Sequence, residues 1–203
     1  MPGLRGIIDR LIGRRTAAEK WNAQYVAGRW TAFDRLDELA HYSVLAGYAL
    51  DLKPGGALLD VGCGDGVLRD RLHPSAFSRY LGLDFAEAIG RAQRRADART
   101  EFVVGDMCDF EPATPFDTIV FNESLYYAAD PLAQLHRYAG KLTADGLFLI
   151  STHFKPNTQR LWDQIGASFD LIDRTVVTNS RGTTWQCGAV SPRRDAVTTR
   201  PER

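Results

Sequence analysis

Cysteine is scarce in this sequence of 203 residues, which has three copies, Cys63, Cys108 and Cys187. An odd number of widely separated cysteines fits neither a disulfide framework nor paired zinc knuckles. We therefore expect no structural disulfide and no metal site, and a reducing cytoplasm is the simplest compartment for the chain.

An excess of charge of one sign is also missing, because 25 Lys and Arg residues balance 25 Asp and Glu residues. Proteins that bind nucleic acids gather phosphate groups with surplus basic side chains. The balance argues against a DNA or RNA partner, although it leaves room for a local basic patch.

Long apolar runs are absent too, since no stretch approaches the roughly 20 residues that span a bilayer. Near the N-terminus, Arg5, Asp9 and Arg10 interrupt the apolar positions, so no secretory signal and no membrane partner are expected. Leu4 and Ile7 begin an apolar pattern with helical spacing and arginines on the other face. We expect this helix to pack on its own domain or on a partner; binding to a membrane surface is the alternative.

The overall composition is that of a soluble globular protein, with 44% hydrophobic and 25% charged residues. The length predicts a single domain over residues 1–191. Within it, we expect residues 1–50 to form a helical region and residues 51–191 to form the core. Residues 192–203, rich in Arg, Thr and Pro, are expected to form a mobile tail.

Short β-branched or apolar runs alternate with helical patterns after residue 56. Strands are predicted at residues 57–61, 80–83, 101–104, 116–121 and 147–151, and helices at residues 67–72, 86–98, 131–142 and 159–167. Two further strands, 171–178 and 184–190, have only a short connection and must be antiparallel. The pattern predicts an α/β fold: an open sheet of about seven strands, mostly parallel with an antiparallel C-terminal hairpin, and helices on both faces.

Polar side chains end three of these strands, where an open parallel sheet binds its ligands. Asp84, Asp106 and Asn122 follow the second, third and fourth predicted strands. Asp84 is placed to accept hydrogen bonds from both hydroxyls of a ribose, and Asp106 to accept one from an adenine amino group. Helix caps or turns are the alternative explanation for these carboxylates.

A glycine-rich turn, residues 62–66, follows the first predicted strand. Glycine allows the backbone to approach a ligand closely. A dinucleotide fingerprint that starts at Gly62 would need another glycine at position 67, where this chain has Val67. The turn and the two carboxylates fit an adenosine without a diphosphate better than they fit NAD.

These motifs resemble those of the class I, Rossmann-like methyltransferases that use S-adenosylmethionine (SAM), in their small-molecule branch. Residues 58–66 resemble the first motif of that family, residues 82–84 the second, residues 103–107 the third and residues 116–122 the fourth. Residues 143–147 resemble the stretch before the fifth strand, with Asp145 where glycine is more usual. The resemblance therefore extends over residues 57–151 in the order of the family.

The resemblance implies roles around the methionine part of SAM. Gly62 and Gly64 would line it, and Cys63 belongs to the same turn, where it is better explained as a small filler than as a nucleophile. Asp60 would hold the SAM ammonium, and the backbone carbonyl of Asn122 would contact the same group.

The resemblance also implies how the adenosine part would be bound. Asp84 would hold the ribose, Phe85 would lie against the adenine, and Asp106 with the backbone of Met107 would contact the edge of the ring. Tyr25 is the favoured contact from an N-terminal helical region that closes over SAM as a lid. The product would be S-adenosylhomocysteine (SAH).

Methyl transfer needs an aligned acceptor, and an amine or hydroxyl acceptor also benefits from a general base. Glu123 and His153 are the candidates, because both follow predicted strands at the mouth of the site. Tyr126 and Tyr127 are expected to shape the acceptor pocket, and His41 to overhang it. The alternatives are that Glu123 caps a helix and that His153 orients a loop.

The acceptor is expected to be a small, specialised metabolite methylated on nitrogen, oxygen or carbon. Residues 122–125 differ from the Asn/Asp-Pro-Pro-aromatic tetrad of enzymes that methylate nucleobases. A homodimer that completes the acceptor pocket is possible. Two other functions stay open: a noncatalytic SAM-binding regulatory module, and a nucleotide-dependent oxidoreductase, which Val67 and Asp106 disfavour.

Overall fold

A computed structural model describes residue 19, residues 22–28 and residues 33–193. The predicted helix that begins at Leu4 and the tail beyond residue 193 lie outside these residues. Residues 22–26 are helical, and helix α2 (Leu39–Leu52) follows the short 3₁₀ helix η1 (Leu36–Glu38). The part of the predicted N-terminal helical region that the structure describes is therefore mainly helical.

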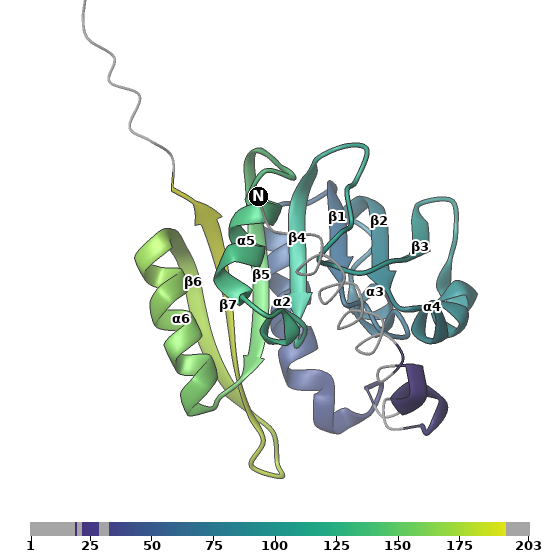
Figure 1. Cartoon of the computed structure of the whole chain (residues 1–203), viewed down its shortest axis with the longest axis horizontal. Helices are drawn as coiled ribbons and strands as arrows, with labels where there is room; N and C mark the ends of the chain where they lie inside the picture. Colours follow the sequence, from purple (N-terminus) through teal and green to yellow (C-terminus); the bar gives the residue numbers. More distant parts are fainter. Residues whose placement is uncertain (1–18, 20–21, 29–32, 194–203) are drawn as a thin grey trace, which may run out of the picture.

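Seven strands form one sheet in the order β3-β2-β1-β4-β5-β7-β6 (Figure 1). Their bounds are β1 (Gly56–Val61), β2 (Phe77–Asp84), β3 (Thr100–Val104), β4 (Phe116–Asn122), β5 (Leu142–His153), β6 (Phe169–Thr178) and β7 (Thr184–Pro192). Strands β1 to β5 pair in parallel, whereas β7 is antiparallel to β5 and β6. The predicted fold class, including the C-terminal hairpin, is confirmed.

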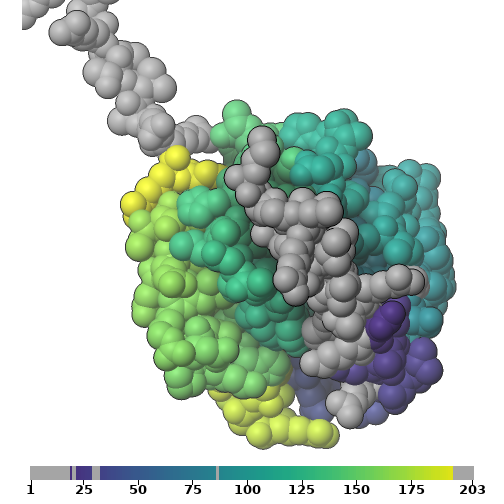
Figure 2. Space-filling view, in the orientation of Figure 1, coloured from purple at the N-terminus to yellow at the C-terminus, as the bar shows by residue number. Residues whose placement is uncertain are grey.

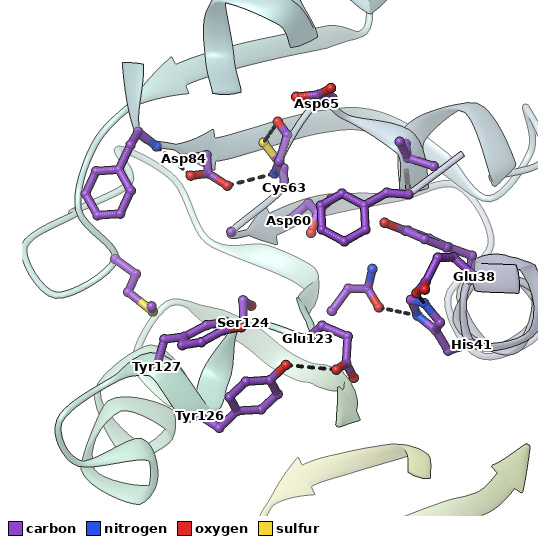
Figure 3. A pocket seen from close by; sticks show the side chains of 18 of the residues that line it. Glu38, His41, Asp60, Cys63, Asp65, Asp84, Glu123, Ser124, Tyr126 and Tyr127 are labelled. Carbon is purple, nitrogen blue, oxygen red and sulfur yellow. Dashed lines mark hydrogen bonds and ion pairs between the residues drawn. The ribbon is translucent and has the colours of Figure 1, made fainter. Parts of the chain in front are cut away.

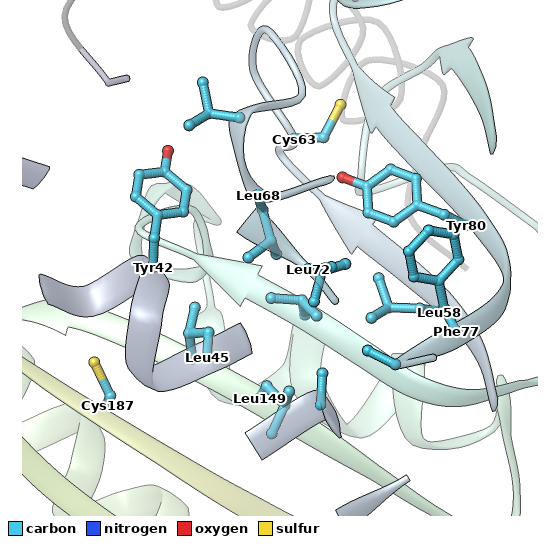
Figure 4. Close-up of a cluster of buried hydrophobic side chains, with 14 of the residues drawn as sticks. Tyr42, Leu45, Leu58, Cys63, Leu68, Leu72, Phe77, Tyr80, Leu149 and Cys187 are labelled. Atoms are coloured by element: carbon cyan, nitrogen blue, oxygen red, sulfur yellow. The ribbon is translucent and has the colours of Figure 1, made fainter. Parts of the chain in front are cut away.

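Helices cover both faces of the sheet because neighbouring residues of each buried strand point to opposite sides. Leu58 and Tyr80 pack with α2, α3 (Val67–Arg71) and α4 (Ala86–Ala92) in one cluster, part of which Figure 4 shows. Leu59 and Leu81 pack with α5 (Pro131–Ala139) and α6 (Pro156–Ser168) in the other. The near-continuous apolar runs of β1 and β2 are the sequence signature of strands that are buried on both faces.

Several element boundaries differ from the sequence prediction; for example, the helix predicted to residue 142 ends at Ala139, and the strand predicted from residue 80 begins at Phe77. The helix predicted to residue 98 ends as an α-helix at Ala92 and continues only as the 3₁₀ helix η2 (Gln93–Arg95). Strand β5 begins at Leu142 rather than at residue 147, because an irregularity in its register with β4 accommodates the extra residues between Leu142 and Leu147. Strand β7 continues to Pro192, which pairs with Phe169, so the ordered core extends beyond the predicted boundary at residue 191.

The strand order reverses between β1 and β4 (Figure 1). From β1 the sheet continues through β2 and β3 on one side and through β4 and β5 on the other. The chain continues from β1 and from β4 toward opposite sides of this point, and an open α/β sheet has its crevice there, at the carboxyl edge. The connection between β6 and β7 lies at the same carboxyl edge, because β6 runs parallel to β5, and it projects from the body of the molecule (Figure 2).

Candidate functional site

A pocket of about 300 Å³ opens at the carboxyl edge of the sheet, where the strand order reverses (Figure 3). Its lining includes all but one of the predicted site residues: Tyr25, His41, Asp60, Gly62, Cys63, Gly64, Asp84, Phe85, Met107, Asn122, Glu123, Tyr126, Tyr127 and His153. The exception is Asp106. Six further lining residues were not predicted from the sequence: Phe33, Glu38, Tyr42, Asp65, Val67 and Ser124.

The turn after β1 depends on glycine for its backbone conformation. Gly62, Gly64 and Gly66 have φ angles of 77°, 56° and 80°, in the left-handed region that other residues avoid. A Cβ atom on Gly62 would come within 2.5 Å of the Cβ of Ser124, in the loop that follows β4. The turn therefore packs closely against the β4 loop while its backbone lines the pocket.

Asp84 ends β2 and binds the glycine turn through its carboxylate. One of its oxygens accepts a hydrogen bond from the backbone N–H of Gly64 at 2.7 Å, and the other accepts from Phe85 at 2.7 Å. Burial raises the pKa of Asp84 to about 6, although these two hydrogen bonds lower it. Since each carboxylate oxygen has two acceptor sites, one on each oxygen is still available to a ligand.

Asp60 is the most deeply buried carboxylate of the lining, with 1% of its surface exposed. Its Oδ2 accepts a hydrogen bond from the Tyr80 hydroxyl at 2.5 Å, whereas its buried Oδ1 has no partner among the residues that the structure describes. Burial raises the pKa of Asp60 to about 7; the charge of Asp84 adds to this effect and the bond from Tyr80 opposes it. A buried acceptor without a donor favours a ligand that brings one.

Asp106 does not line the pocket. Its Oδ1 accepts a hydrogen bond from the backbone N–H of Cys108 at 2.8 Å, as an aspartate that shapes a turn does. The next residue, Met107, does line the pocket, and its carbonyl accepts hydrogen bonds from Gln134 and Arg137 of α5. The predicted contact of Asp106 with adenine stays a prediction.

The Glu123 carboxylate is surrounded by hydrogen-bond donors. Its Oε2 accepts from the Tyr126 hydroxyl at 2.8 Å and the His153 backbone N–H at 3.2 Å, and it also contacts His153 Nδ1. Its Oε1 lies 3.1 Å from the Ser151 hydroxyl, whose single proton has a closer acceptor in Asn122 Oδ1 at 2.7 Å. Among the described residues, Glu123 is the one residue other than glycine with a positive φ angle, which is 54°. Such strain is concentrated at functional sites.

His41 connects the N-terminal helical region to the end of β4. Its Nδ1 lies 2.9 Å from Asn122 Oδ1 and its Nε2 lies 3.0 Å from Glu38 Oε2. Asn122 Oδ1 also accepts a hydrogen bond from the Ser151 hydroxyl at 2.7 Å. Because both ring nitrogens of the buried His41 contact protein groups, this histidine is better placed to orient its neighbours than to move a proton of the ligand.

Tyr25 reaches the pocket from the N-terminal segment and is 6% exposed. The Arg91 guanidinium lies 5.0 Å from the centre of its ring and donates to its backbone carbonyl at 3.2 and 3.3 Å. Arg91 also bonds Asp65 of the glycine turn at 3.0 Å. Burial, followed by the charge of Asp84, raises the pKa of Tyr25. Arg91 therefore joins the predicted lid residue to the turn below it.

Glu38 and Tyr42 were missed because their only signal is their spacing from His41. Residues three and four apart share one face of a helix, so Glu38, His41 and Tyr42 project together. The sequence did not show that this face meets β4. Burial, followed by the charges of Asp60 and Glu38, raises the pKa of the Tyr42 hydroxyl.

The described residues form neither a candidate metal centre nor a candidate membrane-spanning helix. No three His, Cys, Asp or Glu side chains in these ranges gather closely enough to hold a metal ion. None of the described helices combines the length and the apolar character of a membrane-spanning segment.

The fold is that of a Rossmann-like α/β protein, and its pocket lies where the strand order reverses. The family model described as "Methyltransferase domain" matches residues 16–188. The chain therefore belongs to this family, and its fold and motifs are those of the class I SAM-dependent methyltransferases.

Similar proteins carry related descriptions. An uncharacterised methyltransferase of Mycobacterium tuberculosis is 34% identical over 109 residues, which are 52% of this chain and 55% of that protein. The matched part of this chain thus spans about half the length of that curated relative.

Solved structures share the fold at lower identity. The N-methyltransferase NodS from Bradyrhizobium japonicum, in complex with SAH, has a TM-score of 0.68 at 21% identity, over 80% of this chain and 91% of that one. The 1,6-didemethyltoxoflavin-N1-methyltransferase from Burkholderia thailandensis, with its substrate and SAH bound, has a TM-score of 0.71 at 18% identity, over 88% of each chain.

Proposed function

We propose that this chain transfers the methyl group of SAM to a small-molecule acceptor and releases SAH. SAM supplies a methyl group that its sulfonium already makes electrophilic, so the protein has to bind, align the acceptor and exclude water. The observation that carries the proposal is the unpartnered Oδ1 of the buried Asp60 in the pocket lining. This oxygen has no hydrogen-bond donor within the described part of the chain, and the ammonium of SAM would supply one that also carries a positive charge.

The adenosine part of SAM fits the neighbouring strand end. Asp84 has one free acceptor site on each carboxylate oxygen, which matches the two hydroxyls of a ribose. Phe85 and Met107 also line the pocket beyond Asp84, and we propose that they flank the adenine. Tyr25, held by Arg91, would cover the ligand from the N-terminal segment.

For the acceptor, we propose that His153 is the general base and that Glu123 positions it. Three donor contacts, from the Tyr126 hydroxyl and from the backbone and ring N–H groups of His153, occupy Glu123 Oε2, so Glu123 is better placed to orient His153 than to take up a proton. The contact with Glu123 places the ring proton of His153 on Nδ1, so the lone pair is on Nε2. His153 Nε2 makes no hydrogen bond with a described residue, and the side chain is 36% exposed in the pocket lining.

The pocket and the charge balance of the chain support a small metabolite as acceptor. The volume of about 300 Å³ is within the range for small-molecule pockets, and SAM would take up part of it. The chain also lacks the excess of basic residues that nucleic-acid substrates require.

The test combines binding with turnover. We expect SAM and SAH to bind the whole protein in calorimetric titrations, and Asp84→Ala to weaken both by at least about tenfold, because hydrogen bonds to a charged group contribute about 1.5–3 kcal/mol each. Asp163→Ala, at an exposed position of α6, is the matched control and should change neither affinity.

Methyl transfer is then measured by mass spectrometry, as a gain of one methylene across a panel of candidate metabolites. Failure of SAM and SAH to bind would refute the proposal. Tight binding without transfer to any acceptor would instead support a noncatalytic SAM-binding module, and tight binding of NAD alone would support an oxidoreductase.

A further inference from the structure

The pocket lining is rich in carboxylates. Glu38, Asp60, Asp65, Asp84 and Glu123 all line it, whereas no Lys or Arg does within the part of the chain that the structure describes. Of these five, Asp65 is paired with Arg91, which is not itself part of the lining, whereas the basic side chains beside Glu38 and Glu123 are the histidines His41 and His153. A cleft with charges of one sign concentrates ligands of the opposite sign.

Two of these carboxylates lie away from the proposed SAM site. Asp60 and Asp84 stand at the ends of β1 and β2, where the ammonium and the ribose of SAM are proposed to bind. Glu38 and Glu123 lie on the other side of the pocket, with His41 and Tyr126 beside them (Figure 3). SAM would therefore account for the first pair, whereas the second pair, which contacts His41, Tyr126 and His153, lies where the acceptor would enter.

Aromatic rings accompany the second pair. The Tyr126 hydroxyl donates to Glu123, and the ring centres of Tyr126 and Tyr127 are 4.6 Å apart. Tyr42 is one helical turn from Glu38 and lines the same side. Carboxylates among aromatic faces favour a cation, which the charges attract and the rings stabilise. An anionic acceptor would meet like charge from both glutamates.

We propose that the methyl acceptor is a primary or secondary amine that enters the pocket as an ammonium ion, between Glu38 and Glu123. The proposal rests on the function proposed above and specifies its substrate class. His153 Nε2 then accepts one proton from the ammonium, which frees the nitrogen lone pair.

The step that follows is balanced without a further reactant. The amine lone pair forms a bond to the methyl carbon, and the carbon–sulfur bond breaks with its electron pair left on sulfur. SAH and the methylated ammonium product leave the pocket. The proton held by His153 passes to solvent through its partly exposed ring.

The test uses three probes of matched size, phenethylamine, 2-phenylethanol and phenylacetate, titrated into the SAH-bound protein. We expect phenethylamine to bind at least about tenfold more tightly than the other two. A response that does not distinguish the amine from the alcohol and the carboxylate overturns the proposal. Failure of SAH itself to bind would refute the underlying methyltransferase function instead.

Glu38→Gln tests the charge while keeping an acceptor for His41. It should weaken phenethylamine binding by about fivefold or more and leave SAH affinity unchanged, because Glu38 lies away from the proposed SAM site. Glu101→Gln removes one charge from an exposed position of β3 and should have no effect. Equal losses in both variants, or no loss in Glu38→Gln, would contradict the assignment.

Discussion

Replacing Asp60 by Asn should change how the stability of the ligand-free protein depends on pH. In the folded protein the pKa of Asp60 is raised from 3.8 to about 7, mainly by burial. The folded state therefore keeps a proton that the unfolded chain releases. Because unfolding releases this proton between those two pKa values, the free energy of unfolding falls as the pH rises through that window.

The magnitude follows from the size of the shift. A rise of about three pKa units corresponds to about 4 kcal/mol at 1.36 kcal/mol per unit. At pH 5 the Asp60 carboxyl of the unfolded chain is already mostly ionised, so about 1–2 kcal/mol of this effect lies below the pH range tested. Asp60 should therefore cost the wild-type protein about 2–3 kcal/mol of stability between pH 5 and pH 8.

Asn keeps the acceptor for the Tyr80 hydroxyl but cannot ionise. Urea unfolding gives the free energy of unfolding of wild type and of Asp60→Asn at pH 5 and at pH 8. The change between the two pH values is then compared for the two proteins, so that the pH-independent cost of burying an amide cancels. We expect the variant to lose about 2–3 kcal/mol less than wild type over this range. Asp163→Asn, on the exposed side of α6, should behave as wild type. Identical pH dependence of wild type and Asp60→Asn would refute the reasoning.

Four further predictions concern the pocket. SAM affinity should fall as the pH is lowered from 8 to 5. Asp60 and Asp84 have raised pKa values and become protonated in this range, whereas SAM binding requires their carboxylates to be ionised. Calorimetry in two buffers should detect the protons released on binding. His153→Gln should lower kcat by about 10²–10⁴-fold with little change in SAH affinity, and an unchanged kcat would exclude the base. Gly62→Ala should destabilise the protein by about 2–4 kcal/mol, because Gly62 has a positive φ and a Cβ atom there would clash with Ser124. The control Gly90→Ala should be neutral or stabilising, because Gly90 is helical and an added Cβ would meet no described residue outside its own helix within 4 Å. Arg91→Met should weaken SAM binding about tenfold by releasing Tyr25, and titration with SAM would show whether it does.

Most of the fold was readable from the sequence because its signals are local. Buried parallel strands are short apolar runs, and glycines or polar residues mark where they end. The run from Ala57 to Val61 and the following glycine turn located the carboxyl edge of the sheet. The boundaries at Ala92 and Leu142 were wrong because helix termination and strand irregularities depend on neighbouring elements.

The sequence by itself determined the order of strands and helices, the antiparallel hairpin and a pocket near Asp60 and Asp84, because each follows from patterns within a few residues. Only the tertiary structure decided that Glu123 contacts His153, which is 30 residues away in the sequence, and that Glu38 faces this pocket. It also decided that Asp106 accepts a hydrogen bond within its own turn instead of lining the pocket. Such contacts depend on how distant elements pack and on where each side chain points, and neither is encoded in local periodicity.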